Sequence, residues 1–305
     1  CVLVRVFNPT MRPVSISHLA YVGQFVLDER DPGAAAEFTV EEILDRVHMP
    51  PDVTPEDIVH IREMVQVRRR VFATKLGWAH GYRHRISLPK IESGEARPPA
   101  LPSRRLSPDE YAALKVVVDK QLKEGLIEPA RSPFCAQPVL IRKPDGSHRC
   151  CLDFRALNSL TVKDNYPLPN IQANLDALGY ANLFTTLDLL QGFFQVEIEI
   201  ASRPATAFAT PWGQMQYTRM PMGLTSSPGT FMRLVDATFR GLPPGKAFAF
   251  VDDVICPTDG DMQLHMKDVG LVFDRLLEAG FTVRCDKVYF GQKEVAYLGY
   301  LSSAR

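Results

Sequence analysis

The sequence predicts an α+β fold, and three observations support this prediction. From about residue 107 to the C-terminus, short apolar segments typical of strands alternate with amphipathic segments typical of helices. Residues that favour turns separate these segments. Hydrophobic residues make up 46% of the 305-residue chain and charged residues 23%, so the chain can bury a large core in two or three lobes.

By composition, the N-terminal part of the chain divides into a leader, residues 1–60, and a basic extended linker, residues 61–106. The leader pattern predicts strands followed by a helix over Thr39–Val47, with Thr39 as its N-cap. A second helix is predicted to start at Thr54 and to end near Phe72. Prolines predict an extended chain from Leu76 to Ser107. The predicted leader strands are Val2–Phe7, Val14–Ile16 and Tyr21–Leu27.

Residues 107–305 are predicted to form the main domain. Its first helix has a strong start, because Ser107 can cap, Pro108 fits the first turn and Glu110 completes a capping box. Gly125 is predicted to end it. The predicted strands are Pro138–Arg142, Arg149–Phe154, Leu183–Asp188, Thr206–Thr210, Gln214–Arg219, two within Ala247–Cys256, Phe281–Val288 and Val295–Leu301. The other predicted helices are Ser227–Phe239 and Asp261–Ala279.

Charge is unevenly distributed although the net charge is zero. Residues 1–60 hold four Arg against ten acidic residues, a net charge of −6. Residues 61–105 hold eleven Lys or Arg against three Glu, a net charge of +8. The basic segment fits either an electrostatic footprint for a polyanion or a solvated linker, and charge alone leaves both open.

Cysteine usage and hydropathy indicate an intracellular protein. The six cysteines form no C-x-x-C pair and no zinc spacing, which is typical of reduced thiols. No apolar run approaches the roughly 18–20 residues that span a bilayer, and no secretory pattern opens the sequence. Because the chain begins with Cys1 rather than Met, we expect it to be a piece of a longer protein.

Three aspartates lie within or at the end of apolar strands. Asp252 and Asp253 interrupt the apolar segment Phe248–Cys256, and Asp188 ends the strand Leu183–Asp188. Adjacent aspartates at a hairpin tip are usually a solvated turn, and a single one is commonly a strand end or a helix cap. Here the apolar flanks place carboxylates near a core, where they repel each other and resist desolvation. Mg²⁺ offsets both costs, and three carboxylates on two metal ions form a familiar site for displacement at phosphorus.

Further segments around these aspartates follow one another in a specific order: Lys143–Arg149, Asp153–Asn158, Tyr166–Pro169, Leu187–Gln195, Thr206–Phe208, Met220–Pro228, Phe250–Asp253 and Leu298–Tyr300. Together they resemble the reverse transcriptases of gypsy-class long-terminal-repeat retrotransposons, which are related to retroviral polymerases. Each segment alone is weakly specific. The ordered series, from about Ser107 to Tyr300, is very specific.

The resemblance implies a right-hand polymerase fold, with fingers and a palm of antiparallel strands backed by helices, and with the thumb missing. It implies RNA-directed DNA synthesis at a primer 3′-hydroxyl by a two-metal-ion mechanism, with two Mg²⁺ ions or Mn²⁺ as a substitute. The implied partners are a primed RNA or DNA template, deoxynucleoside triphosphates, and thumb, connection and ribonuclease H regions downstream. The leader faintly resembles a protease–polymerase linker. The implied location is the cytoplasm or a virus-like particle, with the nucleus as an alternative.

The resemblance also assigns roles to matching positions. Phe193 would reject a 2′-hydroxyl by steric clash, with Phe194 facing the other way on a strand, and Gly223 would let backbone approach the nucleotide. The implied catalytic residues are Asp188, Asp252 and Asp253, which hold the metal together with Leu189. The implied deoxynucleotide contacts are Lys143, Arg149, Leu189, Phe193, Met222 and Gly223. The implied primer grip is Leu298, Gly299 and Tyr300.

Four positions depart from the family pattern: Phe250 replaces the usual Tyr, Met222 a Gln or Phe, His148 a Trp and Pro144 a Lys. Two alternatives remain open. One is a catalytically silent nucleic-acid-binding fragment derived from such an element. The other is a different palm-type enzyme, such as an RNA-dependent RNA polymerase or a nucleotide cyclase, against which the hairpin at Lys143–Arg149 and Phe193 both count.

Overall fold

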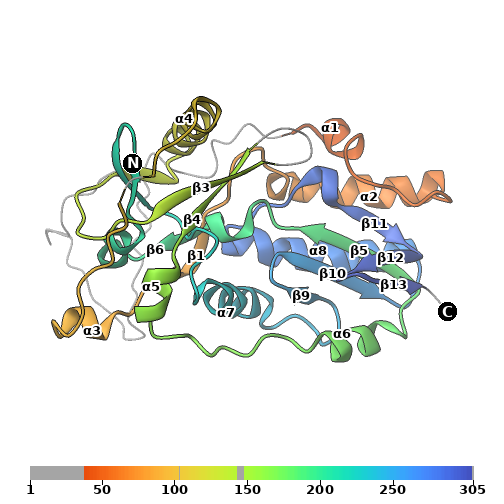
Figure 1. The fold of residues 1–305 in the computed structure, drawn as a ribbon. Coiled ribbons are helices and arrows are strands. Elements are labelled where there is room, and N and C mark those ends of the chain that lie inside the picture. The colour runs from red at the N-terminus through yellow and green to blue at the C-terminus, as the bar shows by residue number, and fades with distance from the viewer. Residues whose placement is uncertain (1–37, 103, 143–147, 304–305) are drawn as a thin grey trace, which may run out of the picture. The chain divides into compact units, whose positions relative to one another are not determined.

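The computed structural model describes residues 38–102, 104–142 and 148–303, without the side chain of Arg149 (Figure 1). The predicted nucleotide contact Lys143 lies outside the described residues, as do the predicted strands Val2–Phe7, Val14–Ile16 and Tyr21–Leu27. Within the described ranges no helix is long and apolar enough to span a bilayer.

The elements alternate between helices and strands along the chain, as the sequence predicted. The helices are α1 (Val40–Leu44), α2 (Pro55–Arg68), α3 (Pro89–Glu92), α4 (Pro108–Lys123), α5 (Arg155–Leu160), α6 (Ile171–Leu178), α7 (Ser227–Phe239) and α8 (Met262–Ala279), with 3₁₀ turns η2 (Arg69–Val71), η3 (Gly192–Gln195), η4 (Ile200–Thr206) and η5 (Cys285–Lys287). The strands are β1 (Ala79–His84), β2 (Ile127–Pro129), β3 (Gln137–Arg142), β4 (His148–Asp153), β5 (Leu183–Asp188), β6 (Val196–Ile198), β7 (Phe208–Thr210), β8 (Gly213–Tyr217), β9 (Phe248–Phe250), β10 (Asp253–Thr258), β11 (Tyr289–Gln292), β12 (Glu294–Tyr297) and β13 (Tyr300–Ser303).

A four-stranded antiparallel sheet has the strand order β11-β5-β10-β9. β5 and β10 pair without interruption from Asp188–Asp253 to Leu183–Thr258. A slip by one residue would turn the buried Leu187 to the other face, so burial fixes this register. The register therefore sets Asp188 opposite Asp253.

Helix α8 packs against β10, β5 and β11 of this sheet, and also against α7 and α2 (Figure 1). Its ends are as predicted, because Asp261 caps the N-terminus and Gly280, at φ +80, closes the C-terminus. Val269, Phe273 and Leu276 lie on one face of the helix and are fully buried. Each such side chain contributes roughly 1.5–3 kcal/mol through burial.

The described part of the predicted leader packs on the same core. Helix α2 lies against α8, where Arg68 donates two hydrogen bonds to the Asp274 carboxylate at 2.7 and 2.8 Å. The His48 N–H donates to the Val288 carbonyl at 2.8 Å, and the His48 carbonyl accepts from the Phe290 N–H at 2.9 Å. This segment thus covers the edge of β11, which would otherwise expose unpaired backbone groups.

The basic segment 61–105 is tied to acidic side chains of the same chain. These ion pairs are Arg62–Glu41, Arg68–Asp274, Arg83–Glu197, Arg85–Glu199 and Arg104–Glu110. At least five of the eleven basic side chains of this segment are therefore engaged within the chain.

A second group of elements comprises the sheet β2-β8-β7, the hairpin β3–β4 and helix α4. Helix α4 starts as predicted, since the Ser107 hydroxyl accepts from the Glu110 N–H at 3.3 Å and the Glu110 carboxylate accepts from the Ser107 N–H at 2.9 Å. The β3–β4 register pairs Ile141 with Arg149 and Arg142 with His148. The predicted hairpin is therefore present.

Two predicted segments differ in the structure. The segment from Leu76 to Ser107 was predicted to be extended, which holds for β1, paired with β6, but not for the short helix α3. Pro89 does not prevent α3, because it occupies the first turn, where a missing N–H has no cost. The prediction that Phe193 and Phe194 lie on opposite faces of a strand is also wrong, since both residues lie in the 3₁₀ turn η3.

The C-terminal strands are shorter than predicted. Of the predicted strand Phe281–Val288, only Val283 makes a bridge, and the chain then turns through η5. The predicted strand Val295–Leu301 is instead the hairpin β12–β13, because Leu298 and Gly299 have φ of +51 and +82 and reverse the chain. An apolar period of two cannot distinguish a strand from two strands joined by a tight turn.

Two buried histidines should make stability depend on pH. Burial lowers the pKa of both His84 and His265 from 6.5 to about 4. As the pH falls below 6.5 the unfolded chain takes up protons that the folded chain refuses until about pH 4. The free energy of unfolding should therefore fall by about 1.4 kcal/mol per pH unit for each histidine in this window.

Urea unfolding at pH 7 and pH 5 measures this loss. His265→Gln should remove about half of it, since a glutamine can still bond Thr185 Oγ1, which lies 2.7 Å from His265 Nε2, but does not titrate. An unchanged pH dependence in His265→Gln would contradict the assignment.

Candidate active site at the end of the central sheet

Asp188 and Asp253 lie directly opposite each other where β5 ends and β10 begins. Asp252 occupies the two-residue loop between β9 and β10, after Val251, whose φ is +57. A β-branched residue rarely adopts this left-handed backbone, so the loop holds local strain. The Leu189 N–H donates to the Asp252 carbonyl at 3.0 Å and ties the loop to the end of β5. The sheet thus brings the three predicted aspartates to one end.

The carboxylates experience burial and like charge together. Burial raises the pKa of Asp252, and the charge of Asp188 adds to the rise. Desolvation also raises the pKa of Asp253, followed by the charges of Asp252 and Asp188, although Asp253 reaches solvent. These shifts reflect the cost of gathering anions in a partly desolvated place.

Lys287 supplies positive charge at this end of the sheet. Its Nζ donates to Asp188 Oδ2 at 2.8 Å, and its charge opposes the pKa rise at Asp252 and Asp253. The turn η5 places it there, because the Arg284 N–H donates to the Asp188 carbonyl at 3.0 Å and the Lys287 N–H donates to the Arg284 carbonyl at 3.1 Å. The segment Phe281–Val288, which was predicted to be a strand, therefore places the Lys287 ammonium group beside Asp188.

The donor set fits a hard divalent cation, because Mg²⁺ prefers carboxylate oxygens. Within the described part of the chain, no three His, Cys, Asp or Glu side chains converge as a finished metal centre. Asp188 and Asp253 are paired by register, Asp252 follows in the loop, and Lys287 engages one oxygen of Asp188. Metal binding would therefore require local rotation of these side chains.

The turn after β5 packs directly on the aspartate loop. Gly192 has no room for a side chain, since a Cβ there would lie 3.3 Å from Asp252 Cβ and 2.8 Å from Phe231 Cζ. The Phe193 ring packs on Phe231, with 5.1 Å between ring centroids, whereas Phe194 stacks on Tyr217. The two rings still face different partners although η3 is not a strand.

The loop before α7 presents the predicted nucleotide contacts Met222 and Gly223. Met222 is 60% exposed, and Gly223 has φ +95, which favours glycine. The Asn158 side chain holds this loop, because its amide donates to the Gly223 carbonyl at 2.8 Å and its Oδ1 accepts from the Thr225 N–H at 2.9 Å. A Gly223 Cβ would lie 3.9 Å from the Leu152 carbonyl of β4, so the loop lies beside the β3–β4 hairpin.

The predicted primer-grip residues form the tight turn of the β12–β13 hairpin. Leu298 and Gly299 both have positive φ, and Tyr297 pairs with Tyr300 across the turn. Tyr300 is 54% exposed, whereas Tyr297 is buried. The turn therefore exposes one aromatic ring, that of Tyr300, while Tyr297 packs in the core.

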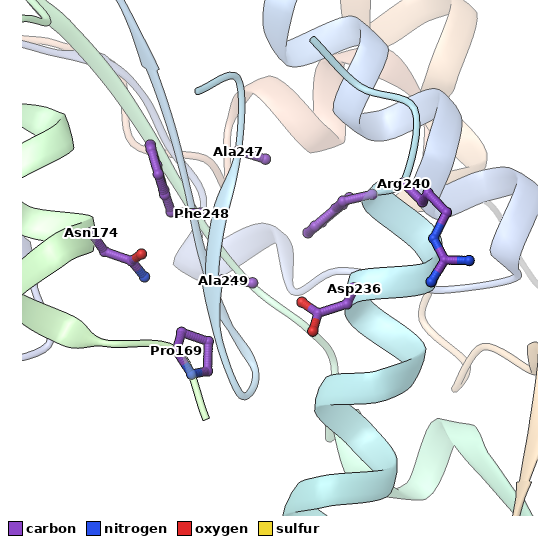
Figure 2. A pocket seen from close by; sticks show the side chains of 8 residues that line it. Pro169, Asn174, Asp236, Arg240, Ala247, Phe248 and Ala249 are labelled. Carbon is purple, nitrogen blue, oxygen red and sulfur yellow. The ribbon is translucent and has the colours of Figure 1, made fainter. Parts of the chain in front are cut away.

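A hollow of about 350 Å³ lies beside β9, and none of the predicted site residues that the structure describes lines it (Figure 2). Phe248 and Ala249 line it from β9, Asp236 lines it from α7, and Arg240 lines it from just after α7. Asp236 already accepts a hydrogen bond from the Tyr166 hydroxyl at 2.6 Å. None of the three aspartates lines this hollow, so it does not compete with the sheet end as the candidate site.

Sequence reasoning gave no role to Gly192, Asn158 or Lys287. For Gly192 the available signal was its position four residues after the strand-end residue Asp188. Asn158 belongs to the segment Asp153–Asn158 of the family pattern, but its partners Gly223 and Thr225 are far away in sequence. Nothing local indicates Lys287, which meets Asp188 only through the fold.

Comparison with known proteins decides the family. The family model for reverse transcriptase (RNA-dependent DNA polymerase) matches residues 141–301, more than half of the chain. The chain belongs to this family. The match spans the three aspartates, the turn η3, and strand β12 with the turn that follows it in this reverse transcriptase chain.

Relatives confirm the predicted gypsy-class resemblance. The chain is 36% identical to the retrovirus-related Pol polyprotein from transposon opus of Drosophila melanogaster over 193 residues, which cover 61% of this chain and 19% of that protein. It is 33% identical to the Pol polyprotein from transposon gypsy of the same organism over 192 residues, which cover 61% and 18%. The chain thus spans about a fifth of the length of these relatives.

Solved structures confirm the predicted α+β polymerase fold. The native Prototype Foamy Virus Protease-Reverse Transcriptase is 26% identical, with a TM-score of 0.73, over 87% of this chain and 35% of that chain. A foamy viral protease-reverse transcriptase in complex with RNA/DNA hybrid gives a TM-score of 0.75 at 24% identity, over 87% and 34%. The central sheet with α7 and α8 is accordingly the palm, and the β2-β8-β7 group with β3–β4 and α4 is the fingers.

Proposed function

We propose that this chain is the fingers and palm of an RNA-directed DNA polymerase, which adds deoxynucleotides to a primer 3′-hydroxyl. One observation carries the proposal: the β5–β10 register sets Asp188 against Asp253, with Asp252 tied beside them through the Leu189 N–H. In a member of the reverse transcriptase family, carboxylates gathered at one sheet end suit phosphoryl transfer with two metal ions.

The proposed chemistry assigns distinct tasks to the aspartates and their neighbours. Two Mg²⁺ ions, or Mn²⁺ in their place, would activate the primer hydroxyl and neutralise the triphosphate. Asp188, Asp252 and Asp253, with the backbone of Leu189, would hold them. Lys287 donates to Asp188, a contact that metal binding would displace, and Asp252 follows Val251, whose backbone is strained.

We assign nucleotide selection to the turn and loop beside these aspartates. The Phe193 ring, supported by Phe231, would lie under the sugar and exclude a 2′-hydroxyl. Met222 and Gly223 would contact the nucleotide from the loop that Asn158 holds. Lys143 and Arg149 would contact the triphosphate from the β3–β4 hairpin, where two cations suit a polyanion. The turn of Leu298, Gly299 and Tyr300 would position the primer end.

The proposed partners follow from the relatives. The similar proteins are Pol polyproteins, and a similar solved structure is in complex with RNA/DNA hybrid. We propose a primed RNA or DNA template and deoxynucleoside triphosphates as substrates, with thumb, connection and ribonuclease H regions downstream. The proposed location is the cytoplasm or a virus-like particle, with the nucleus as an alternative.

Primer extension tests the proposal. The chain expressed with its downstream region should extend a DNA primer on an RNA template in Mg²⁺ and stop in a chelator. It should prefer deoxynucleotides over ribonucleotides by at least about 10³-fold. No synthesis would overturn the polymerase assignment, and template binding without synthesis would favour the catalytically silent fragment. Equal use of deoxynucleotides and ribonucleotides would contradict only the role of Phe193 and would leave the polymerase assignment intact.

A further inference from the structure

Gln195 ends the turn that carries Gly192 and Phe193, and its side chain is fully buried. Its amide donates to the Leu190 carbonyl at 2.8 Å and to the Thr282 carbonyl at 2.9 Å, and its Oε1 accepts from the Thr282 N–H at 2.8 Å. All three partners are backbone groups. The side chain therefore closes the turn onto its own start and onto the segment after α8. We call Leu190, Gln195 and Thr282 the Gln195 clamp.

The surroundings leave the Gln195 amide little freedom. A Cβ at Gly77 would lie 2.4 Å from Gln195 Oε1, so the chain passes directly over the amide. The Gly77 N–H donates to Thr282 Oγ1 at 2.9 Å and locks that passage. On the backbone side, Arg219 donates to the Gln195 carbonyl at 3.0 Å, and its guanidinium lies 3.8 Å from the centre of the Trp78 ring. The clamp is thus held from both sides.

The turn between the two ends of the clamp has backbone geometry that needs support. Gln191 has φ +47, an uncommon conformation for a residue other than glycine. The Phe194 N–H donates to the Gln191 carbonyl at 2.8 Å, and Gly192 is pressed against Asp252 and Phe231. With both ends fixed, the turn carries the ring of Phe193 against Phe231.

We propose that Gln195 is a positioning residue for sugar selection, which it exerts by fixing the turn that carries Phe193. This inference rests on the proposed role of Phe193. Gln195 touches no substrate in this scheme. A purely structural Gln195 would lower stability when replaced and leave the preference for deoxynucleotides unchanged, whereas a positioning residue changes that preference.

A matched pair of substitutions separates these roles. Gln195→Met removes three hydrogen bonds to backbone. Gln214→Met removes the same kind of trio in the fingers, where the Gln214 amide donates to the Ser132 and Phe134 carbonyls at 3.0 and 2.8 Å and accepts from the Ser132 N–H at 2.8 Å. The measurement is kcat/KM for dCTP and for CTP, which differ only in the 2′-hydroxyl, on one primer–template, together with the Kd for that primer–template.

Gln195→Met should lower the preference for dCTP over CTP about 10-fold, mainly through the KM values, with primer–template Kd changed less than about 2-fold. Gln214→Met should keep the preference within about 2-fold of wild type. If Gln195→Met does not fold, Gln195→Asn decides, since it keeps the amide but falls one methylene short; we expect about a 3-fold fall in preference. A folded Gln195 variant with wild-type preference would overturn the proposal.

The substitution Phe193→Ala shows whether a negative result concerns the role of Gln195 or the role of Phe193 in excluding a 2′-hydroxyl. If Phe193→Ala leaves the preference unchanged, the role of Phe193 is wrong and the inference falls with it. If Phe193→Ala lowers the preference while folded Gln195 variants do not, only the role of Gln195 is wrong. The expected result is a fall in both, larger for Phe193→Ala.

Discussion

Asp252→Asn is expected to lose at least about 10³-fold in primer-extension rate while folding like the wild type. The substitution removes one negative charge with almost no change in shape. The loop should keep its place, because the Leu189 N–H bonds to the Asp252 backbone carbonyl rather than to its side chain. Since burial and the charge of Asp188 raise the pKa of Asp252, a neutral amide there relieves repulsion.

The stability of Asp252→Asn separates loss of chemistry from loss of folding. Its free energy of unfolding in urea should equal or exceed that of the wild type, by up to about 1 kcal/mol. Asp259→Asn is the control, since Asp259 is exposed beyond the other end of β10 and should change neither property. Retention of more than about a tenth of the wild-type rate by Asp252→Asn would contradict a metal-holding role.

Local signals in the sequence predicted much of the palm. Helix α8 was predicted over Asp261–Ala279, and the structure shows the local signals that delimit it, an N-cap at Asp261 and a stop at Gly280. The strand β5 and the β9–β10 hairpin were predicted because apolar flanks around Asp188, Asp252 and Asp253 allow few other arrangements. The ordered motifs then gave the family, which the match to residues 141–301 confirms.

Contacts between distant residues were beyond such signals. The segment Phe281–Val288 has the apolar alternation of a strand, yet η5 forms within it and brings Lys287 to Asp188, 99 residues away. The edge of β11 is taken by His48, 241 residues before Tyr289, its bridge partner. No periodicity encodes such a pairing, because both depend on how separate elements pack.

The site was predicted in part. The register places Asp188 opposite Asp253, and Gly223 has a positive φ that favours glycine, but the roles of these residues stay predictions. The roles of Lys143, Arg149 and the metal ions stay predictions. So do the roles of Leu298, Gly299 and Tyr300, although the structure shows why a tight turn occurs there.

A second large effect is expected at Gly77, where the upstream segment meets the palm. A Cβ at this position would lie 2.4 Å from the Gly280 carbonyl oxygen and 2.9 Å from the Thr282 nitrogen, in addition to its contact with Gln195 Oε1. Two of these neighbours are backbone atoms, and Gly280 is held at φ +80 by the end of α8. Because neither backbone atom can move without distorting the end of α8 or the segment after it, Gly77→Ala should lower the free energy of unfolding by about 3 kcal/mol.

Urea unfolding of Gly77→Ala beside Gly179→Ala measures this effect. A Cβ at Gly179 would meet only the Asp176 carbonyl, at 3.4 Å, so that substitution should leave stability within about 1 kcal/mol of wild type. Gly77 lies outside both the predicted main domain at 107–305 and the family match at 141–301. A large loss at Gly77 would therefore mean that residues upstream of the family match, which starts at residue 141, support the core around the turn η3. Wild-type stability in Gly77→Ala would show that residues 75–78 can move away, and the Gln195 clamp would then lose one of its two supports.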